Sequence, residues 1–170
     1  TCVPSPWPLR WVRAFPCRSL PDILGSMDTA TRPDIDQYFL DIAQVVAKRA
    51  TCDRAHIGAV LVKNKYIIST GYNGAPRGLG HCDVIGHQME NDHCVRTTHA
   101  EQNVIIQAAV HGSSTEGCTL YSTHSPCKIC TKIILNAGIQ RVVSLQLYRD
   151  DDVQAMFKEA GVEFVTGNPA

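Results

Sequence analysis

Residues 118–145 read CTLYSTHSPCKICTKIILNAGIQRVVSL, and the order of segments within them decides the fold. Two apolar segments suited to strands, 118–123 and 140–145, flank a segment with helical spacing at 127–136. That helical segment stops before Gly138, a residue typical of helix ends. A strand, a helix and a strand in this order predict two parallel strands joined by a crossover helix.

Further segments extend this pattern in both directions. Apolar runs with turn residues between them predict additional strands, and periods of three and four residues predict additional helices. The expected elements are strands at 57–62, 66–70 and 162–165, and helices at 34–50, 99–110 and 151–160. Residues 71–96 show little periodicity and are predicted to be a long loop. We therefore predict an α/β fold, a three-layer α/β/α sandwich around a mixed sheet of about five strands.

The first predicted helix is amphipathic. Its apolar residues recur every three or four positions, while Asp36 is assigned to the opposite, polar face. The face expected to pack on the sheet carries Ile35, Phe39, Ile42, Val46 and Ala50.

Composition restricts the class of protein. The 170 residues hold 16 Lys plus Arg and 16 Asp plus Glu, so the formal net charge is zero. This balance argues against a protein that binds nucleic acid, because such proteins present a basic surface. No apolar run approaches the roughly 18 residues of a membrane span. Eight cysteines without a secretion signal favour reduced thiols and metal ligands over a disulfide scaffold, and predict a cytoplasmic protein.

Two short motifs carry the chemistry. His99-Ala100-Glu101 opens one helix, and Ser125-Pro126-Cys127-Lys128-Ile129-Cys130 opens the next. His99, Cys127 and Cys130 are three protein ligands for a catalytic Zn²⁺ that keeps its fourth position for water. Glu101 is predicted to carry protons beside that water.

Each motif alone has other interpretations. The Cys-x-x-Cys pair also occurs in structural zinc ribbons and in redox proteins, and His-x-Glu is almost uninformative. Together, with Pro126 before the first cysteine, they match the zinc-deaminase signature H-x-E…P-C-x-x-C.

With these motifs, the chain from about Asp34 to Phe164 resembles the zinc-dependent cytidine and deoxycytidylate deaminase superfamily. It resembles most the deoxycytidylate (dCMP) deaminases of bacteria and phages. The segments that carry the likeness, besides the two motifs, are Ile57-Gly58-Ala59-Val60, Tyr72-Asn73-Gly74-Ala75-Pro76 and His93-Cys94-Val95-Arg96. The resemblance implies hydrolysis of dCMP to dUMP and ammonia, which supplies dUMP for dTMP synthesis.

The resemblance also implies substrate contacts. The Ala100 backbone N–H would hold the base carbonyl, and the Asn73 amide would bond a sugar hydroxyl. Asn73 also fits an ordinary Asn-Gly turn. Tyr148 is predicted to contact substrate, with an amphipathic surface tyrosine as the alternative.

A second zinc site is predicted in the long loop, because an irregular segment without its own core can be folded by a closed four-ligand metal. Related dCMP deaminases often carry such a zinc. Scattered free thiols and solvent histidines are the alternative. The predicted ligands are Cys52, Cys82, His87 and Cys94, with His93 as the alternative histidine.

Phosphate binding departs from the family pattern. Phage-type relatives carry a basic residue near the end of the catalytic helix, where this chain has Val110. The phosphate must then be bound by other donors, such as His111, Lys128, backbone amides or a neighbouring subunit. The resemblance further suggests a homo-oligomer, often a hexamer, activated by dCTP with Mg²⁺ and inhibited by dTTP.

Residues 1–26 differ from the rest of the chain and hold five of its nine prolines. We predict that they are a disordered extension, or an artefact of cloning or start-site assignment, and that residues 27–170 form a single zinc-dependent deaminase domain. That domain holds 16 − 3 = 13 basic and 16 − 1 = 15 acidic residues.

Other functions compete with dCMP deamination. One is deamination of another cytosine nucleotide or nucleoside, or of guanine. Deamination of tRNA or another nucleic acid is a second, which the slightly acidic domain opposes. A third is a regulatory or structural zinc protein without turnover, which the presence of Glu101 opposes.

Overall fold

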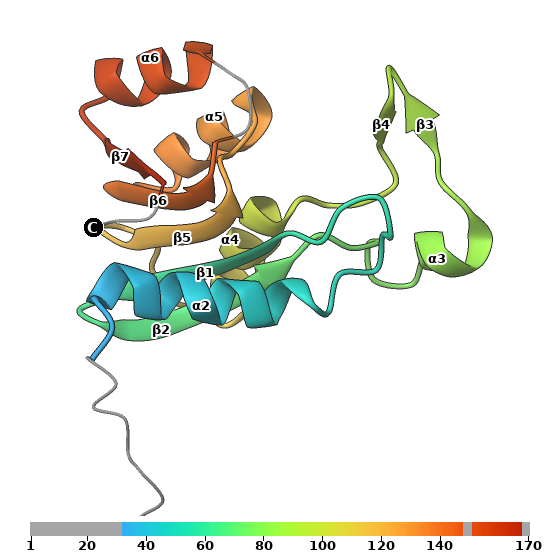
Figure 1. Ribbon diagram of the computed structural model, residues 1–170, viewed down its shortest axis with the longest axis horizontal. Helices are drawn as coiled ribbons and strands as arrows, with labels where there is room; N and C mark the ends of the chain where they lie inside the picture. The colour runs from blue at the N-terminus through green and yellow to red at the C-terminus, as the bar shows by residue number, and fades with distance from the viewer. Residues whose placement is uncertain (1–31, 148–150, 168–170) are drawn as a thin grey trace, which may run out of the picture. The chain divides into compact units, whose positions relative to one another are not determined.

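The computed structural model describes residues 32–147 and 151–167. The predicted boundary between residues 26 and 27, and Tyr148, lie outside this range. Five strands form one mixed sheet in the order β2-β1-β5-β6-β7 (Figure 1). The antiparallel part comprises β2, β1 and β5, and the parallel part comprises β5, β6 and β7. The strands are β1 (Gly58–Lys63), β2 (Tyr66–Tyr72), β5 (Thr119–His124), β6 (Arg141–Gln146) and β7 (Glu163–Thr166).

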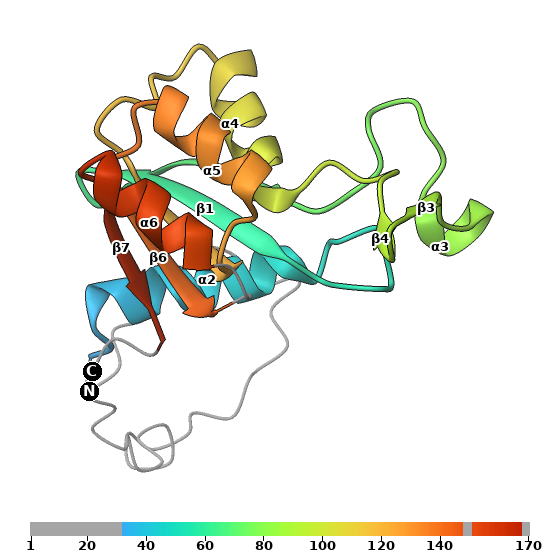
Figure 2. The ribbon, with the colours of Figure 1, turned by 90° about the horizontal axis from the view of Figure 1, so that it is seen from above.

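Helices cover both faces of this sheet. Helix α2 (Ile35–Ala47) lies on one face, and three helices lie on the other (Figure 2). Three residues lie side by side across β1, β5 and β6, namely Leu61, Leu120 and Val142. They pack under the three helices of the second face. Val60 and Val62 point to the opposite face and pack with α2. The predicted three-layer α/β/α fold is confirmed. The three helices are α4 (Ala100–Val110), α5 (Lys128–Asn136) and α6 (Asp151–Glu159).

The buried face of α2 differs from the prediction. The buried residues are Asp36, Phe39, Leu40, Ala43 and Ala47, while Ile35 is exposed. Phe39 belongs to both sets, and the predicted Ile42 and Val46 are partly buried against the same core, so the two faces differ by a rotation smaller than the 100° of one residue. The rotated face is favoured because Asp36 finds partners in the core. Its assignment to a polar face was therefore wrong.

Asp36 is held by an ion pair and a hydrogen bond from the sheet. Arg141 donates from Nη1 and Nη2 to the two carboxylate oxygens, each at 2.7 Å. The Tyr121 hydroxyl donates to Oδ1 at 2.8 Å. These contacts replace the water that burial removes from the carboxylate.

The long predicted loop contains three short elements. They are α3 (Cys82–Ile85), β3 (Met89–Glu90) and β4 (His93–Cys94), the last two forming a hairpin. Segments of two to four residues have no measurable periodicity, so the sequence did not reveal them. We call residues 76–98 the insert. Nowhere in the described ranges does a helix combine the length and apolarity needed to cross a membrane.

Candidate active site and metal ligands

The N-termini of α4 and α5 bring the three predicted zinc ligands together. His99 and Cys127 are the N-cap residues of these helices. His99 Nδ1 lies 3.7 Å from Cys127 Sγ and 3.4 Å from Cys130 Sγ. Tetrahedral zinc with ordinary bond lengths separates nitrogen and sulfur ligands by about 3.6 Å. The donor set and its geometry therefore fit zinc.

Local hydrogen bonds position these ligands. The His99 backbone N–H donates to Gln102 Oε1 at 3.0 Å, which fixes the start of α4. The Thr131 hydroxyl donates to the Cys127 carbonyl at 3.0 Å within α5. Asn103 Nδ2 donates to the Tyr72 carbonyl at 2.7 Å, which ties α4 to the end of β2.

The charges of the three ligands are coupled. A hydrogen bond from the Cys130 thiol, with a further contribution from His99, lowers the pKa of Cys127 to about 3. The hydrogen bond with Cys127 in turn raises the pKa of His99. The Cys127 thiolate, together with burial, raises the pKa of Cys130. Thiolate is the ligand form of cysteine, so Cys127 is prepared to bind a cation at neutral pH.

Glu101 lies in the first turn of α4, beside this cluster. Its side chain is only 4% exposed, and burial raises the pKa of its carboxyl. The Ser122 hydroxyl faces Glu101 Oε1 at 3.4 Å. A carboxyl group with a raised pKa can both accept and release a proton near neutral pH, as proton transfer in catalysis requires.

A cavity of about 410 Å³ opens over the cluster. Its size suits a small-molecule ligand. Its lining joins His99, Glu101 and Cys127 to the 52–57 segment and to the insert. The full lining comprises Cys52, Arg54, Ala55, Ile57, Asn73, Asp92, His93, Cys94, Thr97, His99, Glu101, His124, Ser125 and Cys127.

Among the predicted substrate-binding residues, Asn73 lines this cavity and also holds its wall. Its Oδ1 accepts from the Ile57 N–H and its Nδ2 donates to the Ala55 carbonyl, both at 2.8 Å. One amide hydrogen and one lone pair remain for a ligand. Ala100 is fully buried at the start of α4.

The candidate phosphate donors lie elsewhere. His111 follows the last turn of α4, roughly 18 Å along the axis from His99. It does not reach the cavity of its own chain. Lys128 pairs with Asp152 of α6.

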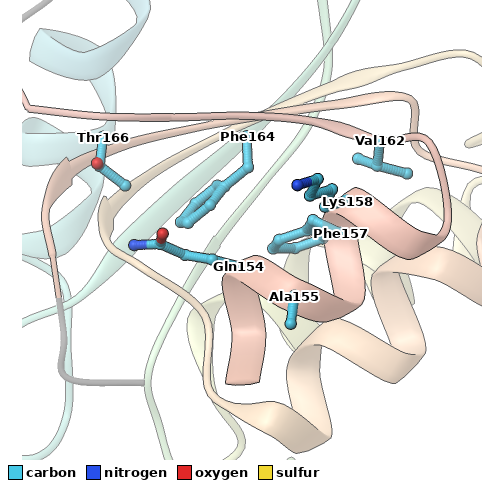
Figure 3. Close-up of a pocket in the computed structure, with 7 residues that line it drawn as sticks. All are labelled: Gln154, Ala155, Phe157, Lys158, Val162, Phe164 and Thr166. Atoms are coloured by element: carbon cyan, nitrogen blue, oxygen red, sulfur yellow. The ribbon is translucent and has the colours of Figure 1, made fainter. Parts of the chain in front are cut away.

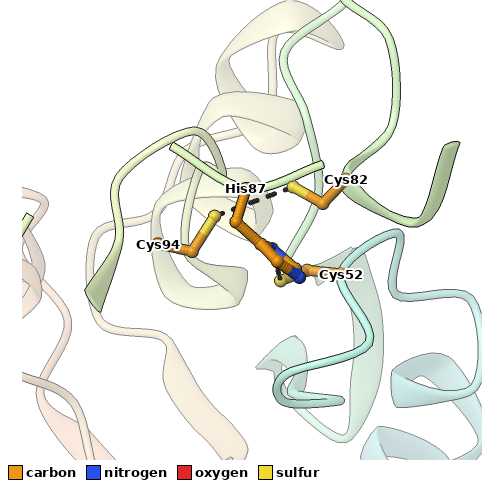
Figure 4. A group of neighbouring side chains, drawn as sticks. All are labelled: Cys52, Cys82, His87 and Cys94. Carbon is orange, nitrogen blue, oxygen red and sulfur yellow. Dashed lines mark hydrogen bonds between the residues drawn. The ribbon is translucent and has the colours of Figure 1, made fainter. Parts of the chain in front are cut away.

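The four residues predicted for a second metal also meet (Figure 4). Cys52 Sγ lies 3.7 Å from His87 Nδ1, and Cys82 Sγ lies 3.7 Å from Cys94 Sγ. All four ligand atoms lie within 4.8 Å of one another, as a tetrahedral ion requires. The alternative histidine, His93, is not in this group and lines the cavity instead.

The sequence analysis missed one partner of the second cluster. Asp53 Oδ1 lies 3.0 Å from His87 Nε2, so it holds the ring with Nδ1 directed at the sulfurs. The one available signal was that Asp53 directly follows the predicted ligand Cys52.

A separate cavity of about 410 Å³ lies between α6 and β7 (Figure 3). Phe157 and Phe164 form its apolar part, and Lys158 lies at its side. The described residues that line it include no Cys, His, Asp or Glu, so it offers none of the usual metal ligands. The candidate chemistry is therefore at the α4 and α5 N-termini.

Known proteins resemble this chain in sequence and in fold. Residues 33–146 match the family model described as the cytidine and deoxycytidylate deaminase zinc-binding region. The chain is 42% identical over 128 residues to ComE operon protein 2 of Bacillus subtilis (strain 168), which covers 75% of this chain and 68% of that protein. It is 38% identical over 125 residues to the deoxycytidylate deaminase of Mycobacterium phage D29, with coverages of 66% and 95%.

A solved structure gives the same result. The dCMP deaminase of cyanophage S-TIM5, in complex with dCMP and dUMP, superposes with a TM-score of 0.70 at 32% identity. The match covers 79% of this chain and 98% of that chain. The ligand cluster, the buried glutamate and these matches lead to one conclusion: the chain belongs to the cytidine and deoxycytidylate deaminase family.

Proposed function

We propose that this chain catalyses the zinc-dependent hydrolytic deamination of dCMP to dUMP and ammonia, which supplies dUMP for dTMP synthesis. The observation that carries the proposal is the three-ligand cluster of His99, Cys127 and Cys130, with the buried Glu101 beside it in the cavity that His99 and Cys127 also line. The likeness to a phage dCMP deaminase with dCMP and dUMP bound supports the choice of substrate.

His99, Cys127 and Cys130 would hold the zinc. When bound, zinc acts as a Lewis acid that lowers the pKa of a water molecule and supplies a nucleophile at neutral pH. Glu101 accepts the proton of the attacking water and delivers it to N3 of cytosine. After the C4–O bond has formed, Glu101 takes the remaining proton from the oxygen on C4 and passes it to the amine, which leaves as ammonia when the C4–N bond breaks.

The substrate is oriented by backbone and amide groups. The Ala100 N–H donates to the base carbonyl. The remaining hydrogen-bond capacity of the Asn73 amide serves a sugar hydroxyl. Tyr148 stays a predicted substrate contact.

The substrate is tested by measuring ammonia release from dCMP, dCTP, deoxycytidine, guanine and a cytosine-containing oligonucleotide in parallel. The proposal predicts the highest kcat/KM for dCMP. A higher value for deoxycytidine or guanine would identify a nucleoside or base deaminase, and turnover of the oligonucleotide alone would identify a nucleic-acid enzyme. Release from none of them, with zinc bound, would favour a regulatory zinc protein.

We also propose that Cys52, Cys82, His87 and Cys94 hold a second, structural zinc that folds the insert. Elemental analysis is expected to give two zinc ions per chain, and one for His87→Ala. Asp53→Asn is expected to weaken this zinc roughly 10-fold or more, because the His87 ring loses its orienting partner. One zinc ion per wild-type chain would instead support the alternative, in which these residues are free thiols and a solvent histidine.

Assembly and regulation complete the proposal. A homo-oligomer, hexameric by family resemblance, would be activated by dCTP with Mg²⁺ and inhibited by dTTP in the cytoplasm. Light scattering with each nucleotide, alongside the rate of dCMP turnover, tests these points. A monomeric protein whose rate of dCMP turnover is unchanged by dCTP and by dTTP would contradict this assembly and this regulation.

A further inference from the structure

A row of small side chains crosses the sheet beneath the proposed catalytic cluster. Ser122 of β5 pairs in register with Ala59 of β1 and with Ser144 of β6. Leu120 and Val142, two positions earlier on β5 and β6, pack against residues of α4, α5 and α6. Residues two positions apart on a strand point to the same face. The two serines therefore lie on the face that these three helices cover.

The two serines are matched in burial and differ in their contacts. Both side chains are fully buried. The Ser122 hydroxyl donates to Glu101 Oε1 at 3.4 Å, whereas Ser144 Oγ makes no hydrogen bond within the described part of the chain. A buried hydroxyl costs free energy unless it is hydrogen-bonded. The contact with Glu101 thus gives Ser122 a reason to be polar that Ser144 does not share.

The Ser122 hydroxyl is a donor that does not depend on the state of the ligand cluster. The Cys130 thiol also makes a hydrogen-bonding contact with the Glu101 carboxyl. A cysteine that binds zinc is a thiolate and has no proton to donate. The serine hydroxyl keeps its proton and continues to donate to the carboxylate. Hydrogen bonds to a catalytic group are often long before substrate binds and tighten in the complex, so 3.4 Å is compatible with this role.

We propose that Ser122 is a positioning residue for deamination, whose hydroxyl holds Glu101 Oε1 and leaves Oε2 to exchange protons with the water and the substrate. The inference rests on the proposed function, in which Glu101 transfers two successive protons to different atoms of one substrate. A carboxylate fixed through one oxygen keeps the other in place for both transfers. The hydroxyl therefore acts on the transition state more than on substrate binding.

Ser122→Ala and Ser144→Ala test the proposal, because each removes one fully buried hydroxyl from the same row of the sheet. Ser122→Ala is expected to lower kcat for dCMP about 10-fold and to change KM less than about twofold, since a hydrogen bond to a charged group is lost. Ser144→Ala is expected to keep the wild-type kcat and KM. A merely structural role would predict the same kinetic change in both variants.

Ser122→Thr is the conservative variant. It restores the hydroxyl, and threonine suits a strand position whose in-register neighbours are as small as Ala59 and Ser144. We expect it to recover most of the wild-type kcat. Zinc content and urea unfolding are measured for every variant, so that loss of metal or of the fold is separated from loss of positioning.

Crystal structures of wild type and of the two alanine variants give a readout that does not depend on turnover. The Glu101 side chain is expected to keep one position in wild type and in Ser144→Ala, and to occupy more than one in Ser122→Ala. A single position in Ser122→Ala would overturn the role of Ser122. Equal kcat in the two alanine variants would also overturn it, as would a raised KM at unchanged kcat in Ser122→Ala.

The proposed function and the role of Ser122 can fail separately. If wild-type protein with zinc bound releases ammonia from none of the substrates, the proposed function fails. The position of Glu101 in the crystal structures then still decides whether Ser122 holds the carboxylate.

Discussion

Glu101 shows how burial gives an ordinary residue a chemical task. Its carboxyl is 4% exposed, faces Ser122 and lies two residues after His99, the proposed zinc ligand. Removal from water raises its pKa, so the proton can be gained and released during one turnover. A position at the surface of α4 would leave the same residue ionised throughout.

Glu101→Gln is expected to keep both zinc ions and to lower kcat by about 10³-fold or more, because glutamine cannot transfer a proton. Ammonia release and elemental analysis measure the two quantities. Glu159→Gln, at the exposed end of α6, serves as the control and should match wild type. Turnover of Glu101→Gln at the wild-type rate would show that another group carries the proton.

At the scale of elements, the position of α4 depends on a close contact with β2. A Cβ atom added at Gly71 would lie 2.4 Å from the Val104 nitrogen and 2.6 Å from the Ala100 carbonyl oxygen. The Ser69 hydroxyl donates to the Val104 carbonyl at 2.7 Å in the same contact. Strand and helix backbones therefore touch directly, and this contact supports the turn that carries Glu101.

Gly71→Ala is expected to lower the free energy of unfolding by about 2 kcal/mol or more, because both clashing groups are backbone atoms. It should also lower kcat, since α4 must shift with its catalytic residues. Gly80→Ala is the control, because its Cβ would meet only the exposed side chain of Ile85. Urea unfolding of both variants gives the comparison, and equal midpoints would show that β2 and α4 separate without cost.

At the scale of the whole molecule, one ion-pair network joins α2 to three strands. Asp36 of α2 accepts from Tyr121 of β5 and Arg141 of β6, and Arg141 Nε lies 3.0 Å from Glu163 of β7. The Arg141 guanidinium lowers the pKa of Asp36 despite its burial. Asp36 therefore stabilises the folded chain above its unfolded pKa, and this contribution is lost as pH falls through the lower folded pKa.

Asp36→Asn is expected to cost about 3 kcal/mol at pH 7, because Arg141 loses the buried one of its two charged partners and keeps only Glu163. The difference from wild type should begin to shrink as pH falls below about 4, where Asp36 of the unfolded chain takes up a proton, and should be lost as pH falls through the lower pKa of the folded state. Denaturant unfolding at several pH values measures the difference in the free energy of unfolding between the variant and wild type. Asp41→Asn, on the exposed side of the same helix, should behave as wild type at every pH. A difference that stays constant with pH would show that shape, and not charge, is what Asp36 contributes.

The spacing of apolar residues along the chain was sufficient to predict most of the fold. The five strands follow from apolar runs with turn residues between them, and the four long helices follow from apolar spacings of three and four residues. The ligands His99, Cys127 and Cys130 were equally accessible, because each motif lies within six residues and opens a predicted helix. The choice of Cys52, Cys82, His87 and Cys94 came from family resemblance joined to the chemistry of metal ligands.

Contacts between distant residues decided the rest. Asp36 and Arg141 are 105 positions apart, and their pairing accounts for the burial of a carboxylate on α2. His87 rather than His93 joins the second cluster, because Asp53 and the path of the insert place its ring there. Such positions depend on packing and electrostatic pairing across the folded chain, which spacing along the sequence does not record.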